Sequence, residues 1–212
     1  MRRRIIAISA SALAILGLTA GTTLATTPYT LDQKQELTAG GTSAWIGSMV
    51  LAQTFTPSIT GPLSEVDVYV AVTVTPNTQA GVVPAAPSSL MVQIVTTDAG
   101  DHFPTTTVVE SANLSPSGDP GWTPVSFGTP KPVTAGTVYA IVITPTSGYN
   151  LGWSGTCSGG QYSPGEALMM DAGFGWRTVT NWAAAHGGNS EVYCQQDFAF
   201  REYILPVLAK IS

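Results

Sequence analysis

The sequence has few charged residues and very few positive ones. Charged residues make up 10% of the 212-residue chain, against about 25% in a typical soluble protein. Of the eight Lys and Arg residues, three are Arg2, Arg3 and Arg4 at the extreme N-terminus. Without them, five positive residues stand against thirteen acidic ones, a formal charge of −8. This balance excludes a nucleic-acid-binding protein, because phosphate contacts require positive charge.

Long apolar runs are also scarce, and the clearest one lies near the N-terminus. Residues 5–18 form an apolar segment of about 14 residues behind the three arginines. This length is typical of a signal peptide and falls short of the ~20 residues that span a bilayer. The small residues Thr23 and Ala25 predict cleavage after Ala25, with an uncleaved N-terminal anchor as the alternative. We therefore expect a signal peptide over 1–25 and one secreted bacterial domain over 26–212, without a membrane span.

Cysteine and histidine are rare, with two residues of each kind. An even number of cysteines in an exported chain predicts a disulfide between Cys157 and Cys194. The bridge would stabilise the fold by roughly 3–4 kcal/mol in the chain-entropy model, and two buried free thiols are the alternative. A zinc site is not expected, because His102 and His186 lack suitable spacing from the cysteines. Both histidines lie in polar segments and are expected to be solvated.

Signatures of catalysis are missing as well. Residues 152–155 (Gly-Trp-Ser-Gly) resemble part of a nucleophile elbow, but Thr156 breaks the G-x-S-x-G spacing. Glu166 and Asp171 lie five positions apart on a predicted strand, so they point to opposite faces and make a poor pair for glycoside hydrolysis. We therefore expect a protein that is not an enzyme.

Alternation with period two is the strongest positive signal. Residues 64–74 place five valines at every second position, with Asp67 and Tyr69 among the residues between them, which predicts a strand with one buried face. Further runs are predicted as strands: Ala52–Pro57, Leu90–Val95, Thr106–Ala112, Trp122–Phe127, Val138–Thr144, Tyr149–Trp153, Ala167–Asp171 and Glu191–Tyr203. Residues 76–88 form a long loop. No convincing helical period is present, so we predict a single all-β sandwich of the jelly-roll kind, with eight, nine or more antiparallel strands.

The order of these strands and turns, beginning at Leu51-Ala-Gln-Thr-Phe-Thr-Pro57, is similar to a known family. The later matching features are Leu-Met-Val-Gln-Ile-Val at 90–95, Asp98-Ala-Gly100 with Pro104, Gly121–Phe127, Val133–Val142, Tyr149 with Trp153, and Asp197–Arg201. Over about residues 31–203 the chain resembles secreted bacterial β-sandwich modules of the choice-of-anchor type. The resemblance implies an extracellular jelly-roll-like sandwich, often an accessory module of surface proteins and glycan-acting enzymes, without catalytic residues. The chain departs from the pattern in its loop at 75–89.

Aromatic residues give the most direct indication of a ligand. Six of the eighteen aromatic residues lie within 149–182, where an even spread over the mature chain would give about three. Sugar rings stack on such side chains, while amide and charged groups bond their hydroxyls. The expected ligand-binding residues are Trp176, Trp182, Tyr162, Arg177 and Asn181. Trp176 and Trp182 are placed in Gly- and Asn-rich loops, where exposed rings suggest a partner. For Tyr149, Trp153 and Trp122, we expect the alternative, a place in the core.

The metal that this composition favours is calcium. Extracellular sandwiches hold calcium with loop carboxylates and carbonyls, and Asp98 and Asp101 are the best candidate ligands. The competing interpretation is that an Asp in such a turn caps backbone N–H groups.

Two functions follow from these observations. The first is binding of a polysaccharide or cell-surface glycan through loops near 150–190. The second is a structural or protein-interaction role in the cell envelope or an extracellular assembly, with itself or envelope proteins as partners. Exposed aromatic faces would favour glycans, whereas an apolar patch or a free edge strand would favour assembly.

Overall fold

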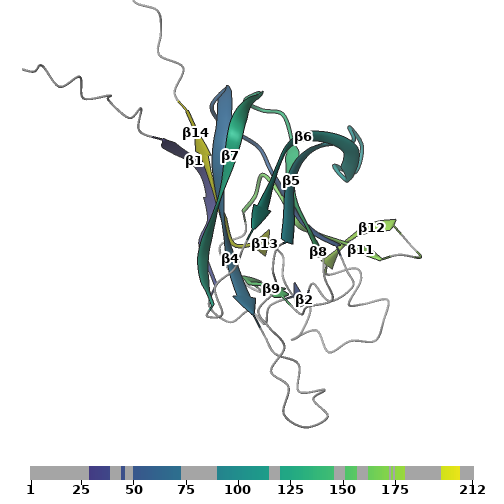
Figure 1. The fold of residues 1–212 in the computed structure, drawn as a ribbon. Coiled ribbons are helices and arrows are strands. Elements are labelled where there is room, and N and C mark those ends of the chain that lie inside the picture. The colour runs from purple at the N-terminus through teal and green to yellow at the C-terminus, as the bar shows by residue number, and fades with distance from the viewer. Residues whose placement is uncertain are drawn as a thin grey trace, which may run out of the picture.

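The computed structural model is almost entirely strands and turns. It describes residues 29–38, 44–45, 50–72, 90–114, 120–145, 151–156, 162–171, 173, 175–179 and 197–205. Two antiparallel sheets pack face to face (Figure 1). From β3 to β9 the chain passes from one sheet to the other at every step except between β5 and β6. The prediction of an all-β sandwich is therefore confirmed.

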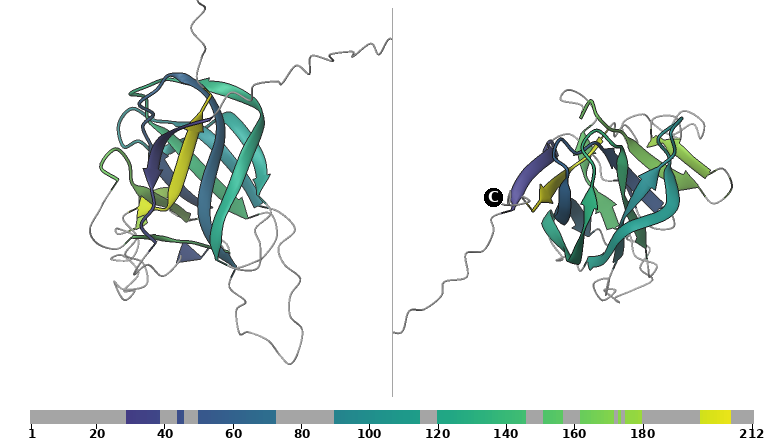
Figure 2. Two further views of the ribbon diagram at one scale, coloured as in Figure 1. Left: turned by 90° about the vertical axis from the view of Figure 1, so that its left-hand side faces the viewer. Right: turned by 90° about the horizontal axis from the view of Figure 1, so that it is seen from above.

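The first sheet presents four strands side by side (Figure 2). These are β1 (Thr30–Gln35), β14 (Phe200–Ile204), β4 (Gly61–Val72) and β7 (Gly121–Val133). The far end of β4 pairs with β9 (Leu151–Trp153), which pairs with β2 (Ala44–Trp45). The long strand β4 is thus the centre of this sheet, with β7 on one side and β14 followed by β9 on the other.

The second sheet also contains six strands. Their order is β12 (Gly175–Thr178), β11 (Ala167–Asp171), β3 (Val50–Phe55), β8 (Tyr139–Pro145), β5 (Leu90–Thr97) and β6 (Pro104–Leu114). A short ladder of β10 (Gly155–Thr156) and β13 (Asp197–Phe198) lies beside the two sheets. Ala199 separates β13 from β14, so the long strand predicted toward residue 203 is interrupted there.

The core lies between the sheets and follows the predicted alternation. Val66, Val68 and Val70 of β4 are at most 1% exposed and belong to one apolar cluster. Trp153 is fully buried and stacks on Phe198 with ring centres 4.7 Å apart. Its indole N–H also donates to the backbone oxygen of residue 199 at 2.9 Å. The prediction that Trp153 packs in the core is confirmed.

Several predictions concern residues outside the described part of the chain. They are the signal peptide and its cleavage site, the loop at 76–88, Tyr149, the disulfide between Cys157 and Cys194, His186, and the ligand-binding roles of Trp182 and Asn181. Within the described ranges, no helix combines the length and the hydropathy needed to cross a membrane.

Candidate functional site

Four adjacent strands align outward side chains across the first sheet. Backbone register places Lys34 of β1 opposite Arg201 of β14, and Arg201 opposite Asp67 of β4. One step along, Tyr69 of β4 lies opposite Trp122 of β7. Neighbouring strands are about 4.8 Å apart, so these side chains meet on one surface. We call this surface the polar face; it comprises Lys34, Glu36, Asp67, Tyr69, Trp122, Arg201 and Tyr203.

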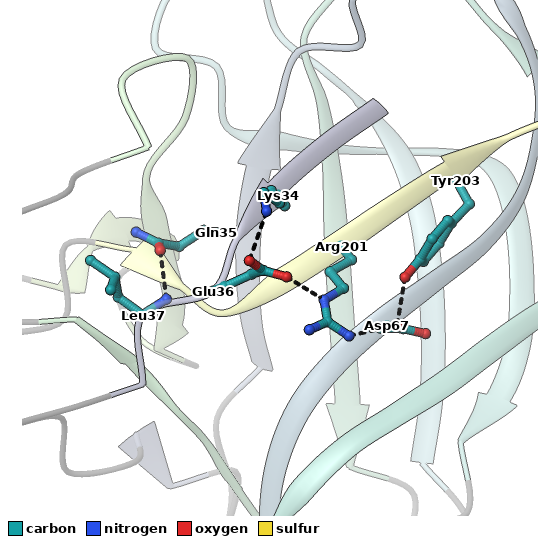
Figure 3. Close-up of polar contacts among 7 residues, drawn as sticks. All are labelled: Lys34, Gln35, Glu36, Leu37, Asp67, Arg201 and Tyr203. Carbon is teal, nitrogen blue, oxygen red and sulfur yellow. Dashed lines mark hydrogen bonds and ion pairs between the residues drawn. The ribbon is translucent and has the colours of Figure 1, made fainter. Parts of the chain in front are cut away.

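Arg201 is the centre of the polar face (Figure 3). Its Nε donates to Oε1 of Glu36 at 2.7 Å, and its Nη1 lies 3.6 Å from Oδ2 of Asp67. The guanidinium carbon also lies 4.1 Å from the ring centre of Trp122. Lys34 Nζ donates to the other oxygen of Glu36 at 2.8 Å. Hydrogen bonds from Lys34 and then Arg201 are the main reasons why the pKa of Glu36 is lowered.

The aromatic side chains of the polar face are held by the same network. The Tyr203 hydroxyl donates to Oδ2 of Asp67 at 3.0 Å, and burial followed by this bond raises the Tyr203 pKa. Tyr69 meets Trp122 edge to face, with ring centres 5.4 Å apart. The rings of Tyr69, Trp122 and Tyr203 are each partly exposed. The polar face therefore offers apolar ring surface beside fixed donors and acceptors.

Sequence reasoning missed this surface. The prediction that Trp122 packs in the core is wrong, because Trp122 lies in the outward phase of β7, opposite Tyr69, and is only partly buried. A signal was present in the alternation itself. Asp67 and Tyr69 occupy the outward positions between buried valines of β4, and Arg201 and Tyr203 alternate with buried residues of β14.

Trp176 lies on the opposite side of the sandwich, and its predicted loop setting is wrong. It belongs to β12 and pairs with Met170 of β11. It packs against a small apolar cluster on the outer side of the second sheet, which we call the apolar face: Ala52, Val95, Ala140, Val142 and Leu168, with Val50 and Phe103 beside them. Arg177 is the next residue of β12, so its side chain points to the other side of the sheet. Trp176 and Arg177 therefore do not form one platform.

Tyr162 lies in the core. Its side chain is 9% exposed, and its ring meets Phe200 edge to face at 5.1 Å. Its hydroxyl donates to Oε1 of Gln33 at 2.8 Å, and burial is the main reason why its pKa rises to about 12. Its backbone N–H donates to Asp197 at 2.8 Å. A buried ring with an engaged hydroxyl does not suit sugar stacking, so Tyr162 acts here as a packing residue.

The two aspartates considered for calcium lie in the turn between β5 and β6. Asp98 accepts hydrogen bonds from the N–H groups of Gly100 at 2.9 Å, Asp101 at 2.8 Å and Phe103 at 3.1 Å. These backbone bonds, with that from Asp101 the largest cause, lower the Asp98 pKa. In the described residues, no three His, Cys, Asp or Glu side chains are grouped as metal ligands. Asp98 thus has the capping role named as the competing interpretation.

A scan against protein-family models finds no match to the chain, and a search of curated proteins finds no similar sequence.

Proposed function

We propose that this is a secreted, non-catalytic sandwich that binds a neutral polysaccharide or cell-surface glycan through the polar face. The sequence predicts the same class of ligand at loops near 150–190. The proposed site lies elsewhere, because Tyr162 is buried, Trp176 packs on the apolar face, and Arg177 points away from Trp176.

The observation that supports this proposal is the arrangement around Arg201. Its guanidinium lies over Trp122 and between the carboxylates of Glu36 and Asp67. Sugar hydroxyls are both donors and acceptors, so a guanidinium with two flanking carboxylates can pair with neighbouring hydroxyls. The groups are already held in place, which lowers the entropic cost of binding.

The charge of the polar face favours a neutral glycan. Lys34 and Arg201 are balanced by Glu36 and Asp67, which pair with them directly. An anionic chain would have to compete with these carboxylates for the two cations. We therefore expect binding to neutral polysaccharides with weak salt dependence, since few ions are released on association.

A pair of tryptophan variants tests the site. The purified protein is first screened on a glycan array with and without calcium, and the best neutral ligand is titrated. Trp122→Ala should weaken binding at least about tenfold, because the sugar loses the ring on which it stacks and Arg201 loses the ring that holds its guanidinium in place. Trp176→Ala should leave the affinity of folded protein within about threefold, since it lies on the other sheet.

The opposite result would restore the site expected from sequence. If Trp176→Ala abolishes binding and Trp122→Ala does not, the ligand binds beside β12. If the array yields no glycan ligand for folded protein, the proposed function is wrong.

A second candidate function, assembly through an edge strand, is favoured by one observation. Four large apolar side chains on or beside β1 are exposed: Tyr29 by 55%, Leu31 by 40%, Leu37 by 45% and Ile59 by 38%. In the described part of the first sheet, β1 pairs only with β14. Free strand edges with apolar side chains favour pairing with another chain. Sedimentation velocity tests this idea: a concentration-dependent oligomer that Leu31→Lys dissociates would support it, and a monomer at all concentrations would contradict it.

A further inference from the structure

A polar cavity of about 420 Å³ lies on the other side of the sandwich from the polar face. Its walls come from the end of β3, the start of β8, the turn at 162–166 and the turn that precedes β6. These segments contribute two threonines, a histidine, a serine and Glu166 to the lining, with Val138 and Pro164 as its apolar part. This volume is near the small end of the range for ligand pockets, so it suits one ring rather than a long chain.

One wall of the cavity is fixed by two threonines. Thr54 Oγ1 accepts from the backbone N–H of Glu166 at 2.8 Å, and the Thr54 N–H donates to the Glu166 carbonyl at 3.0 Å. Thr56 Oγ1 donates to the carbonyl of Pro164 at 3.1 Å. Gly165 lies so close to the Thr54 carbonyl that a β-carbon would collide with it. The threonine hydroxyls are therefore occupied in holding the wall.

A second part of the lining comes from His102, whose backbone has an uncommon conformation. Its backbone φ is +57°, in the left-handed region that non-glycine residues seldom adopt. The three hydrogen bonds to Asp98, together with a bond from the Asp98 N–H to the Phe103 carbonyl at 3.0 Å, close this turn around it. His102 therefore reaches the cavity from a well-braced turn.

Three polar side chains of the cavity have no bonding partner among the described residues. The Glu166 carboxyl, the His102 ring and the Ser163 hydroxyl make no hydrogen bond or ion pair within the described part of the chain. Burial is the main cause that raises the Glu166 pKa; the charge of His102 acts next and lowers it, and Asp101 raises it by less. A partly buried carboxyl without a hydrogen-bond partner gains from a positively charged group that bonds it directly.

We propose that this cavity binds a single amino-sugar ring, with the ammonium group on the Glu166 carboxylate. Ser163 and His102 bond ring hydroxyls, and Val138 and Pro164 contact the apolar side of the ring. The carboxylate selects for a free ammonium group, because an acetylated amine carries no charge to pair with Glu166. This site is independent of the glycan surface proposed above, since it lies on the other sheet.

The experiment titrates the protein with glucosamine, N-acetylglucosamine, glucose and calcium chloride, by calorimetry and by NMR of side-chain signals. Glucosamine should bind at least about tenfold more tightly than the two neutral sugars, and it should lower the Glu166 pKa. Glu166→Gln should weaken glucosamine binding about tenfold or more. Glu65→Gln is the matched control, because Glu65 lies on the first sheet, where it accepts from Ser126 at 2.6 Å; it should bind normally.

A second variant separates binding from folding. His102→Asn keeps a residue type that tolerates a positive φ, so the turn should persist while glucosamine affinity drops severalfold. The proposal is overturned if glucosamine does not bind, if it binds Glu166→Gln as tightly, or if N-acetylglucosamine binds equally well. It is also overturned if calcium displaces glucosamine and itself requires Glu166, because the cavity is then a metal site.

Discussion

The two outer surfaces of the sandwich carry different kinds of side chain. On the polar face, partly exposed aromatic rings alternate with charged groups, and Arg201 lies over Trp122. On the apolar face, aliphatic side chains cover the sheet: Ala52, Ala140 and Leu168 are fully buried, and Trp176 packs against the same cluster. Among the described side chains, Trp122 lies on the polar face among charged groups, and Trp176 lies on the apolar face over buried aliphatic groups.

This difference separates Trp176, which packs on a buried apolar cluster, from Trp122, which lies partly exposed among charged groups and is the ring that we propose binds a ligand. A ring over buried apolar residues keeps water from them, so its main role is stability. A ring among paired ions protects little apolar surface, so selection for stability alone does not explain its position. The amino-acid composition does not distinguish Trp122 from Trp176; only the side chains around each ring in the structure do.

The largest effect is expected from removing the tryptophan of the apolar face. Trp176→Ala should lower the free energy of unfolding by about 3 kcal/mol, because it uncovers the cluster around Leu168 as well as losing its own contacts. Trp122→Ala should cost about 1 kcal/mol, mainly its contacts with Arg201 and Tyr69. Urea unfolding of both variants measures the two values. Equal losses would show that the two faces do not differ in the way we infer.

Much of the fold could be predicted because its core strands are regular. Val66, Val68 and Val70 give β4 a clear period of two, and burial of one face is what produces that period. Strands β1 and β12 were not predicted, and the reason differs between them. β1 lacks an apolar inward face, because Gln33 and Gln35 point inward, and Gln33 accepts from the Tyr162 hydroxyl there. β12 has four residues, and Gly175, at a φ of +76°, marks the end of a tight hairpin rather than a long loop.

The polar face could not be predicted from local pattern. The Tyr203 hydroxyl and Asp67 are 136 residues apart in the chain and meet only because β14 pairs with β4. Each strand shows which of its residues point outward, but the order of strands in the sheet decides which of them meet. Asp67 and Tyr69 were visible as outward residues, whereas their contact with Arg201 and Trp122 required the sheet topology.

Strand β14 carries a second contrast, between its own two sides. Arg201 points outward and is paired, whereas Glu202 points inward and is fully buried, and neither of its carboxyl oxygens makes a hydrogen bond of good geometry within the described structure, although the Gln33 backbone and Asp32 lie close to it. Burial, and next the charge of Asp32, raise the pKa of Glu202 to about 8. A carboxyl with a raised folded-state pKa contributes stability that is fully present below its unfolded value of about 4.5 and is lost as pH rises through 8.

We therefore expect the protein to become less stable between pH 5 and pH 8. Each pKa unit corresponds to about 1.4 kcal/mol, so even half of the Glu202 shift gives about 2 kcal/mol across this window. Asp197, whose pKa is raised mainly by burial to about 6, acts in the same direction. Glu202→Gln should flatten most of the slope and be more stable than the parent at pH 8. Thermal unfolding at several pH values tests this; an unchanged slope in Glu202→Gln, with Glu65→Gln as control, would contradict it.

The smallest effect is expected within the ion network of the polar face. Arg201→Lys keeps the charge but loses the flat group that lies on Trp122 while bonding Glu36, so it should cost about 1 kcal/mol. Lys34→Gln should change stability by less than about 0.5 kcal/mol, because that side chain is 53% exposed and makes one ion pair. Urea unfolding of the two variants, repeated with Trp122→Phe in a double-mutant cycle, isolates the contact between guanidinium and ring. If Arg201→Lys costs no more than Lys34→Gln and shows no coupling to Trp122, the guanidinium is not held by the ring, and the polar face loses the preorganised centre on which its proposed binding depends.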